Sequence, residues 1–248
     1  MTMFILILTA LHAVGTDDAL YYREQSAAQV LPLAGISDGD LRALDAAMAA
    51  FLAGQPERLV PDGETALSME VLGQVQPAFN EKEMAHMWDC AALFALLRKV
   101  RSRLVAWAVL LMALGAWLLN DRRRIRRAAW LSPLILLIPL GGFAAWATAD
   151  FDAAFTFFHR VLFTNDLWLL DPRTDLLIRV CPESMFRHMG ARIGLMGLGA
   201  LVGVPLVVTI ITIIWPKGRS EASNTWNDRD MRRASAQKRI VFGKTGMR

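Results

Sequence analysis

Two histidines stand in segments where an imidazole could carry protons. His86 lies in the stretch EKEMAHMWD, with Glu83 and Asp89 three residues to either side, so all three share one side of a predicted helix. His159 follows the aromatic run FTFF and precedes Phe163. An imidazole has an unperturbed pKa near physiological pH and can both accept and donate a proton. The two segments predict an acid–base site, although a solvated helix face and an interfacial histidine would give the same patterns.

Apolar stretches determine the elements that must position these histidines. Hydrophobic residues make up 54% of the chain and charged residues 20%, so the apolar residues are segregated, which is typical of a membrane protein. A membrane-spanning helix needs about 20 mostly apolar residues. We therefore expect an all-α membrane protein with four transmembrane helices and a small, mostly helical extracytoplasmic domain. The expected spans, of which the first is short, are residues 1–15, 104–119, 128–149 and 193–215.

The basic residues orient these spans. The predicted loop at residues 120–127 carries five arginines and the tail at residues 216–248 is rich in lysine and arginine, and such segments face the cytoplasm. Both termini are then cytoplasmic, in a multi-pass protein of the bacterial inner membrane. Residues 16–103 and 150–192, which hold the two histidines, are then extracytoplasmic. The net charge of +4 is explained by orientation and contact with anionic lipids, so we expect no nucleic acid partner.

The first outer segment contains two predicted helices. Ser37 gives a capping-box-like start to one helix, and Gly54 ends it. A second helix over residues 79–100 leads into the second span. Cys90 and Cys181 both lie outside, where a disulfide is permitted. A disulfide pair and two free thiols are both open at this point.

Three stretches, in their order relative to the spans, resemble a known family. They are the pair Tyr21–Tyr22, the sequence FNEKEMAHMWD at residues 79–89, and the block FHRVLFTNDLWLLDPRTDLLIRVCPESMF at residues 158–186. The chain resembles bacterial four-span membrane proteins that include the lipoprotein intramolecular transacylases. The resemblance implies that His86 and His159 are catalytic. It implies supporting roles for further matched residues: Tyr22, Glu83, Asp89, Asn165, Trp168, Asp171, Asp175, Pro182 and Glu183.

The implied reaction moves the sn-2 acyl chain of a diacylglyceryl-cysteine lipoprotein to the α-amino group of that cysteine, giving a lyso-form lipoprotein. The amine, with a pKa near 8, must lose a proton, and the departing glycerol oxygen must gain one. Both groups belong to one substrate molecule, so proximity supplies much of the acceleration, and we expect no cofactor or metal. Asp89 or Glu83 could fix a histidine tautomer, and Arg160 or Asn165 could stabilise the oxyanion. The expected partners are diacylglyceryl-modified lipoproteins and membrane lipids.

Other functions remain open on the sequence. A metal-dependent membrane hydrolase would use Glu83, His86 and His159 as ligands, although no HExxH pair occurs. A thiol mechanism would use Cys90 or Cys181 with a histidine as base. A non-enzymatic membrane scaffold or a transporter subunit is a further alternative. Transport is disfavoured because the three longer spans contain none of the charged residues that mark an ion or solute path.

Overall fold

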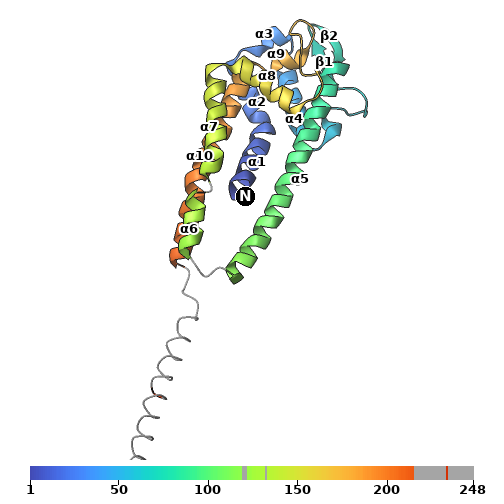
Figure 1. The fold of residues 1–248 in the computed structure, drawn as a ribbon. Coiled ribbons are helices and arrows are strands. Elements are labelled where there is room, and N and C mark those ends of the chain that lie inside the picture. Colours follow the sequence, from blue (N-terminus) through green and yellow to red (C-terminus); the bar gives the residue numbers. More distant parts are fainter. Residues whose placement is uncertain (119–121, 132, 215–232, 234–248) are drawn as a thin grey trace, which may run out of the picture. The chain divides into compact units, whose positions relative to one another are not determined.

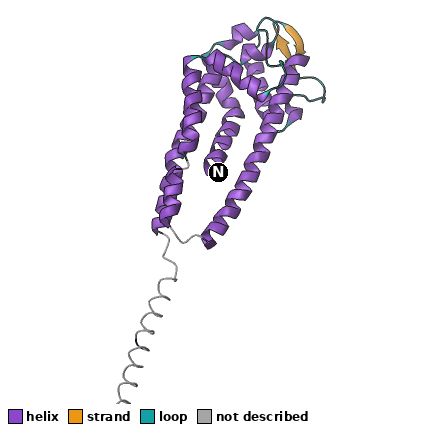
Figure 2. Ribbon diagram, viewed as in Figure 1, coloured by secondary structure: helices purple, strands orange, loops and turns teal. Residues whose placement is uncertain are grey.

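The computed structural model describes residues 1–118, 122–131, 133–214 and 233, and the chain divides into two units, Met1–Val208 and Thr209–Arg248. The first unit is mostly helical, with one short β-hairpin (Figures 1 and 2). The described elements, in chain order, are α1 (Thr2–Gly15), α2 (Asp18–Ala27), α3 (Val30–Ala34), α4 (Asp38–Ala53), the 3-10 turn η1 (Pro56–Arg58), β1 (Ser68–Val71), β2 (Gln74–Pro77), α5 (Glu81–Leu118), α6 (Arg122–Leu131), α7 (Leu134–Ala149), α8 (Phe151–Leu162), α9 (Leu176–Val180) and α10 (Glu183–Ile214).

Helix α4 forms where the sequence predicted it. The hydroxyl of Ser37 accepts a hydrogen bond from the backbone N–H of Asp40 at 3.1 Å, which caps the first turn. Gly54 ends the helix with φ of 104°, in the left-handed region that glycine favours. The guanidinium of Arg98, on α5, donates to the carbonyl oxygen of Leu52 at 2.6 Å. The C-terminal end of α4 is therefore tied to α5.

Helix α5 runs without a break from residue 81 into the second apolar stretch, as the sequence predicted. A reciprocal capping box starts it: Asn80 Oδ1 accepts from the backbone N–H of Glu83 at 3.0 Å, and Glu83 Oε2 accepts from that of Asn80 at 2.8 Å. Both α1 and α4 pack against α5. At the end of α1, a Cβ on Gly15 would lie 2.4 Å from the ring of Phe94, so only glycine allows this approach. His86 is thus carried by a well-supported helix, six residues after the capping residue Asn80.

The hydrophobic core of the first unit lies mainly around α4. Leu41, Leu44 and Phe51 are among its fully buried side chains, and the core continues into α3, the hairpin, the start of α5 and α9. Strands β1 and β2 pair antiparallel through a turn at Leu72 and Gly73, both with positive φ. The sequence analysis predicted no strand here, so the hairpin is a finding of the structure.

By length and hydropathy, α10 is the described helix that could cross a membrane, with mean hydropathy 2.4 in its apolar window. Helices α1 and α2 are bent by 61° at the break between them, and they would count as a second span if the two together form one bent span. Residues Leu137–Ala149 of α7 are apolar but form a shorter segment. These findings agree with a mostly helical membrane protein, and the four expected spans stay a prediction.

The arginine-rich segment is helical in the structure. Helix α6 begins at Arg122, where the sequence analysis expected a loop over residues 120–127. Pro133 then stands at the N-cap position of α7. Proline is well suited to a helix start because it has no backbone N–H to leave unpaired. The third apolar stretch is therefore divided between α6 and α7.

Candidate acid–base site

His86 and His159 come from distant parts of the chain and lie side by side. Their ring centroids are 6.1 Å apart, and each residue is only 8% exposed. His86 is on α5, and His159 is in the last turn of α8. The carboxylate of Asp150 caps the start of α8 by accepting from the N–H of Ala153 at 3.0 Å. The structure thus brings together the two histidines that the sequence analysis singled out.

Aromatic rings enclose the two imidazoles. The ring centroid of His159 lies 4.0 Å from that of Phe155 and 4.9 Å from that of Trp168, and Phe163 lies 5.2 Å from His86. Burial lowers the pKa of His159 below its ordinary value. Burial, with a smaller contribution from the charge of His159, lowers the pKa of His86 to about 4. Both imidazoles are therefore neutral at pH 7.

The hydrogen bond of His159 defines which of its nitrogens is basic. Its Nδ1 lies 2.8 Å from the carbonyl oxygen of Phe155, one helical turn earlier. A carbonyl oxygen only accepts, so Nδ1 must carry the proton of the neutral ring. The lone pair then lies on Nε2. His159 is consequently oriented as a base.

His86 has a different environment. Its Nε2 lies 3.6 Å from the sulfur of Cys90, one turn further along α5. Its Nδ1 is buried, with no hydrogen-bond partner among the described residues. Neither Glu83 nor Asp89 bonds to a histidine in the described part of the chain, because the carboxylates of both are bound elsewhere. The sequence-based idea that one of these acids fixes a histidine tautomer therefore has no contact to support it.

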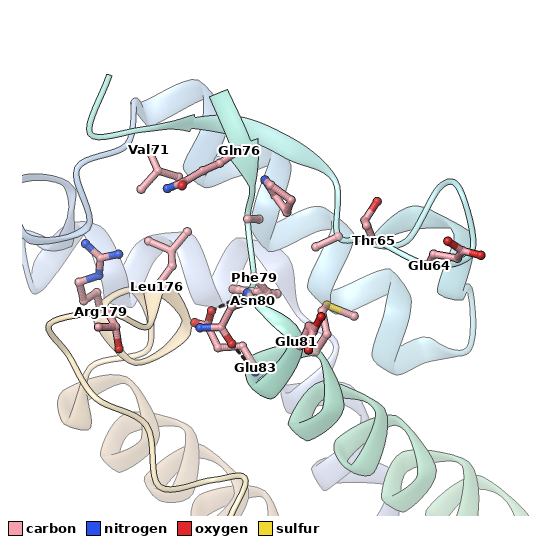
Figure 3. Close-up of a pocket in the computed structure, with 15 residues that line it drawn as sticks. Glu64, Thr65, Val71, Gln76, Phe79, Asn80, Glu81, Glu83, Leu176 and Arg179 are labelled. Carbon is pink, nitrogen blue, oxygen red and sulfur yellow. Dashed lines mark hydrogen bonds between the residues drawn. The ribbon is translucent and has the colours of Figure 1, made fainter. Parts of the chain in front are cut away.

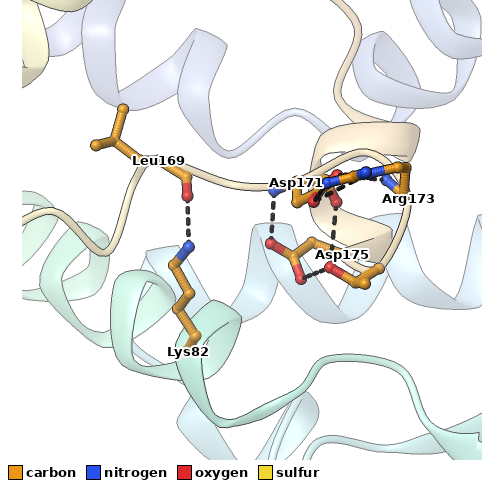
Figure 4. Close-up of polar contacts among 6 residues, drawn as sticks. Lys82, Leu169, Asp171, Arg173 and Asp175 are labelled. Atoms are coloured by element: carbon orange, nitrogen blue, oxygen red, sulfur yellow. Dashed lines mark hydrogen bonds and ion pairs between the residues drawn. The ribbon is translucent and has the colours of Figure 1, made fainter.

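A loop held by α5 covers His159. Asp89 accepts a hydrogen bond from the side-chain amide of Asn165 at 2.9 Å. The backbone carbonyl of Asn165 accepts from the indole N–H of Trp168 at 3.0 Å, and the indole packs on the imidazole. Lys82, two turns before Asp89 on α5, donates to the carbonyl of Leu169 (Figure 4). Asp89, Asn165 and Trp168 thus form a chain of contacts that ends at His159.

We expect the Asn165→Ala substitution to lower kcat about tenfold while leaving the melting temperature nearly unchanged, because a surface hydrogen bond contributes about 1 kcal/mol. The loss should appear in kcat, since the loop that carries Trp168 would lose its bond to Asp89 and hold the indole less firmly against the ring of His159. Steady-state kinetics and thermal unfolding of the purified protein measure the two effects. Asp166→Ala, at the next position in the same loop, is the matched control. Wild-type kcat in Asn165→Ala would contradict this role.

Glu83 connects α5 to the third motif. Its Oε1 accepts a hydrogen bond from the backbone N–H of Leu177 at 2.6 Å, and its side chain is 2% exposed. Asn80 donates from its side-chain amide to Asp175 at 3.0 Å. Burial raises the pKa of Glu83, while the backbone N–H groups that bind the carboxylate oppose the rise. These bonds join the start of α5 to the start of α9.

Asp175 and Asp171 organise the turn before α9 (Figure 4). Asp175 accepts from the backbone N–H of Asp171 at 2.8 Å and from the hydroxyl of Thr174 at 2.9 Å. Asp171 pairs with Arg173 at 2.7 Å, and this neighbour holds the pKa of Asp171 at about 2. Asp171, Asp175 and Glu83 therefore shape the backbone around the site, without touching either imidazole.

A cavity of about 450 Å³ lies where the start of α5, the hairpin and α9 meet (Figure 3). Asn80, Glu81 and Glu83 line it from α5, Gln76 from β2 and Arg179 from α9. Neither histidine is among the lining residues. The cavity is therefore adjacent to the first turn of α5 and separate from the imidazole pair.

The remaining predicted site residues lie apart from the imidazoles. Tyr22 donates its hydroxyl proton to Asp38 at 2.6 Å, and the guanidinium of Arg42 stands 3.6 Å from the centroid of its ring. Glu183 forms an ion pair with Arg187, one turn along α10, at 2.8 Å. Arg160 follows His159 on α8 and is exposed. The predicted set thus falls into an imidazole pair, its supporting loops, and surface contacts.

Sequence reasoning noted Phe155 and Cys90 but missed the contacts that they make with the two histidines. Phe155 stands four residues before His159, and Cys90 four residues after His86. That spacing places side chains on the same helix face and was visible in the sequence. Asn80 and Glu83 also fit a capping-box pattern. The i, i+4 partners of each histidine were the available signal.

The structure also bears on the metal and thiol alternatives. Among the described residues, no group of three or more His, Cys, Asp or Glu side chains could hold a metal ion. Glu83, which the metal alternative needs as a ligand, has both oxygens on backbone N–H groups. Cys90 and Cys181 are free thiols. Burial raises the pKa of Cys90 to about 12, so its reactive thiolate form is scarce at neutral pH.

A mostly helical membrane protein with two buried imidazoles side by side has groups of the kind that transfer protons. The family model of the lipoprotein intramolecular transacylase Lit matches residues 1–186. The chain therefore belongs to the Lit family, whose members are named as acyltransferases that act on lipoproteins.

Solved structures show the same fold. An in meso structure of the membrane integral lipoprotein intramolecular transacylase Lit from Bacillus cereus aligns with 85% of this chain and 89% of its own, with a TM-score of 0.61 and 19% identity. A variant of that protein, with one histidine replaced by arginine, aligns over 84% and 86% with a TM-score of 0.59 and 19% identity. No curated protein matches the sequence.

Proposed function

We propose that this protein transfers the sn-2 acyl chain of a diacylglyceryl-cysteine lipoprotein to the α-amino group of the same cysteine. Membership of the Lit family supports the class of reaction. The observation that carries the mechanism is the pair of neutral imidazoles at 6.1 Å, enclosed by aromatic rings. An acyl substrate suits such surroundings because its chains are apolar.

In this mechanism His159 moves the proton. The amine nitrogen attacks the ester carbonyl carbon, so a C–N bond forms and the ester C–O bond breaks. Nε2 of His159 accepts the proton that the nitrogen loses, and it returns this proton to the departing glycerol oxygen. The products are an amide and a free hydroxyl, and His159 is again neutral. Amine and ester belong to one molecule, so binding alone brings them together.

His86 stabilises the oxyanion in the same step. A neutral imidazole donates one N–H, and a donor already in place stabilises a developing negative charge without reorganisation. The charge of His159 helps to lower the pKa of His86, so His86 stays neutral while His159 carries the proton. Arg160 is exposed, and the side-chain amide of Asn165 donates to Asp89, so this mechanism assigns the donor role to His86.

The proposed topology places this site on the extracytoplasmic side. Both termini and the arginine-rich residues 120–127 are then cytoplasmic, in accordance with the positive-inside rule. The apolar character of α10 supports the last span. The four proposed spans are residues 1–15, 104–119, 128–149 and 193–215.

Expression in bacteria that lack N-terminal acylation of lipoproteins tests this function. Mass spectrometry of a digested lipoprotein should show an N-acyl, mono-O-acyl cysteine peptide. The product should be lost with His86→Ala and with His159→Ala. His188→Ala is the control, because His188 pairs with Glu24 away from the two imidazoles. A diacylglyceryl peptide with a free amine in cells that carry the wild-type protein would contradict the proposal.

A further inference from the structure

Cys90 is the one polar side chain that contacts the reactive edge of His86 among the described residues. Its sulfur lies 3.6 Å from Nε2, and the two residues stand four apart on α5, on the same helix face. His86 is 8% exposed, so the contact lies in largely buried surroundings. The nature of the contact therefore influences where the proton of the neutral ring resides.

The surroundings of Nδ1 indicate which of His86 and Cys90 donates the hydrogen bond. Nδ1 of His86 is buried and has no hydrogen-bond partner among the described residues. A buried N–H without an acceptor is rarer in proteins than a buried acceptor without a donor, because the N–H loses a strong interaction with water. The proton is therefore better placed on Nε2, where a sulfur atom can accept it.

We propose that Cys90 is a positioning residue that holds His86 as the Nε2–H tautomer, with the sulfur of Cys90 accepting the hydrogen bond. This inference rests on the proposed function for its catalytic meaning. This tautomer places the N–H of His86 on Nε2, the nitrogen that lies against Cys90. A substrate oxyanion is a much better acceptor than a thiol sulfur, so it takes over the hydrogen bond when it forms.

The two imidazoles then carry their protons on different ring nitrogens. The carbonyl of Phe155 fixes the proton of His159 on Nδ1, which leaves Nε2 as a base. Cys90 fixes the proton of His86 on Nε2, which leaves that nitrogen as a donor. Each ring is oriented by a residue four positions away on its own helix, so each assignment is built into one helix.

Cys90 does not serve as a nucleophile in this arrangement. Burial raises the pKa of its thiol to about 12, and the negative charge of Asp89 adds to the rise. A thiol with such a pKa is almost entirely protonated at neutral pH. Its sulfur is therefore available as a weak acceptor, and an acyl-thioester intermediate is not expected.

Substitution in the full-length protein tests the proposal. With a diacylglyceryl lipopeptide as substrate, we expect Cys90→Ala to lower kcat about fivefold with KM unchanged, as suits the loss of one weak hydrogen bond. Cys90→Ser should recover part of the rate, since a hydroxyl oxygen also accepts. Cys181→Ala is the matched control, because Cys181 is the other free, half-buried cysteine and has no contact with either catalytic imidazole among the described residues.

Nitrogen NMR of the protein labelled with 15N-histidine reads the tautomer directly. The four histidines are assigned by single substitutions. In the wild type, Nε2 of His86 should show the signal of a protonated nitrogen and Nδ1 that of a bare one. In Cys90→Ala the two signals should move toward an average of both tautomers. This measurement needs no substrate, so it stands even if the proposed reaction is wrong.

Three results would overturn the proposal. One is a wild-type histidine spectrum with Nδ1 of His86 protonated. A second is a spectrum and a kcat that Cys90→Ala leaves unchanged. The third is an acyl group found on Cys90 by mass spectrometry, with no activity in Cys90→Ala, which would make the thiol a nucleophile. Absence of N-acylated product from the wild-type protein would instead count against the proposed function.

Discussion

Replacing His159 by glutamine should lower kcat about a thousandfold, because the substrate amine loses the base that the proposed mechanism assigns to it. Replacing His86 by alanine should lower kcat about a hundredfold, the usual cost of removing one oxyanion donor. His86→Gln should keep a substantial part of the rate, because the glutamine amide still offers an N–H. His159→Gln should be no better than His159→Ala. Comparable rescue by glutamine at both positions would contradict the division of roles.

The pH dependence of kcat/KM gives a second measurement of this prediction. The substrate amine has an ordinary pKa near 8, so the rate should fall with slope one as the pH drops below about 8. Burial lowers the pKa of His159 below 6.5, so its neutral, active form persists to lower pH. The slope should therefore steepen to two only below pH 6.5. In His159→Gln the second break should disappear, and its persistence would assign it to another group.

Glu83→Ala should destabilise the fold by about 3 kcal/mol or more, because two backbone N–H groups lose their acceptor and at least one of them is buried. The melting temperature of the purified protein should fall by about 10 °C. Hydrogen exchange should increase first in residues 171–180, since Leu177 is one of the two donors. Activity should fall with stability, because His86 lies in the next turn.

A graded variant and a neighbour make this prediction specific. Glu83→Gln keeps one acceptor oxygen but places an amide NH₂ against the second N–H, so we expect a smaller loss. Glu81→Gln changes an exposed carboxylate in the same turn and should leave stability nearly unchanged. Equal melting temperatures for wild type and Glu83→Ala would show that the link between α5 and α9 contributes little.

Local signals in the sequence predicted local structure well. Ser37 and Gly54 marked the ends of α4, and both make the expected cap contacts in the structure. The aromatic surroundings of His159 were also visible, because Phe155 lies one helical turn away on the same helix. The pairing of His86 with His159 followed from resemblance to a family, since no local pattern reports a contact over such a separation.

The parts that sequence reasoning could not reach depend on distant partners. Glu83 reads as one acid on a helix face, and its partner Leu177 is 94 residues further along the chain. The hairpin has two four-residue strands. In β1 buried and exposed side chains alternate, but over four residues only, and β2 is fully exposed, so the pattern was too short to predict the hairpin. Its turn also includes a leucine at positive φ, whose backbone N–H binds the carbonyl of Gly35 from another segment.

The hydrogen-bond acceptor of His159, a backbone carbonyl, allows the imidazole to lie in apolar surroundings. Many hydrolases orient the basic imidazole with an ionised carboxylate, whereas here an uncharged peptide carbonyl does so. In the resting state neither ring carries a formal charge, so hydrocarbon can lie against them without the dehydration of an ion. Charge arises only within the reaction cycle, when a proton is in transit. Under the proposed function, the acyl chains of the substrate can therefore lie against His159 without displacing water from a charged group.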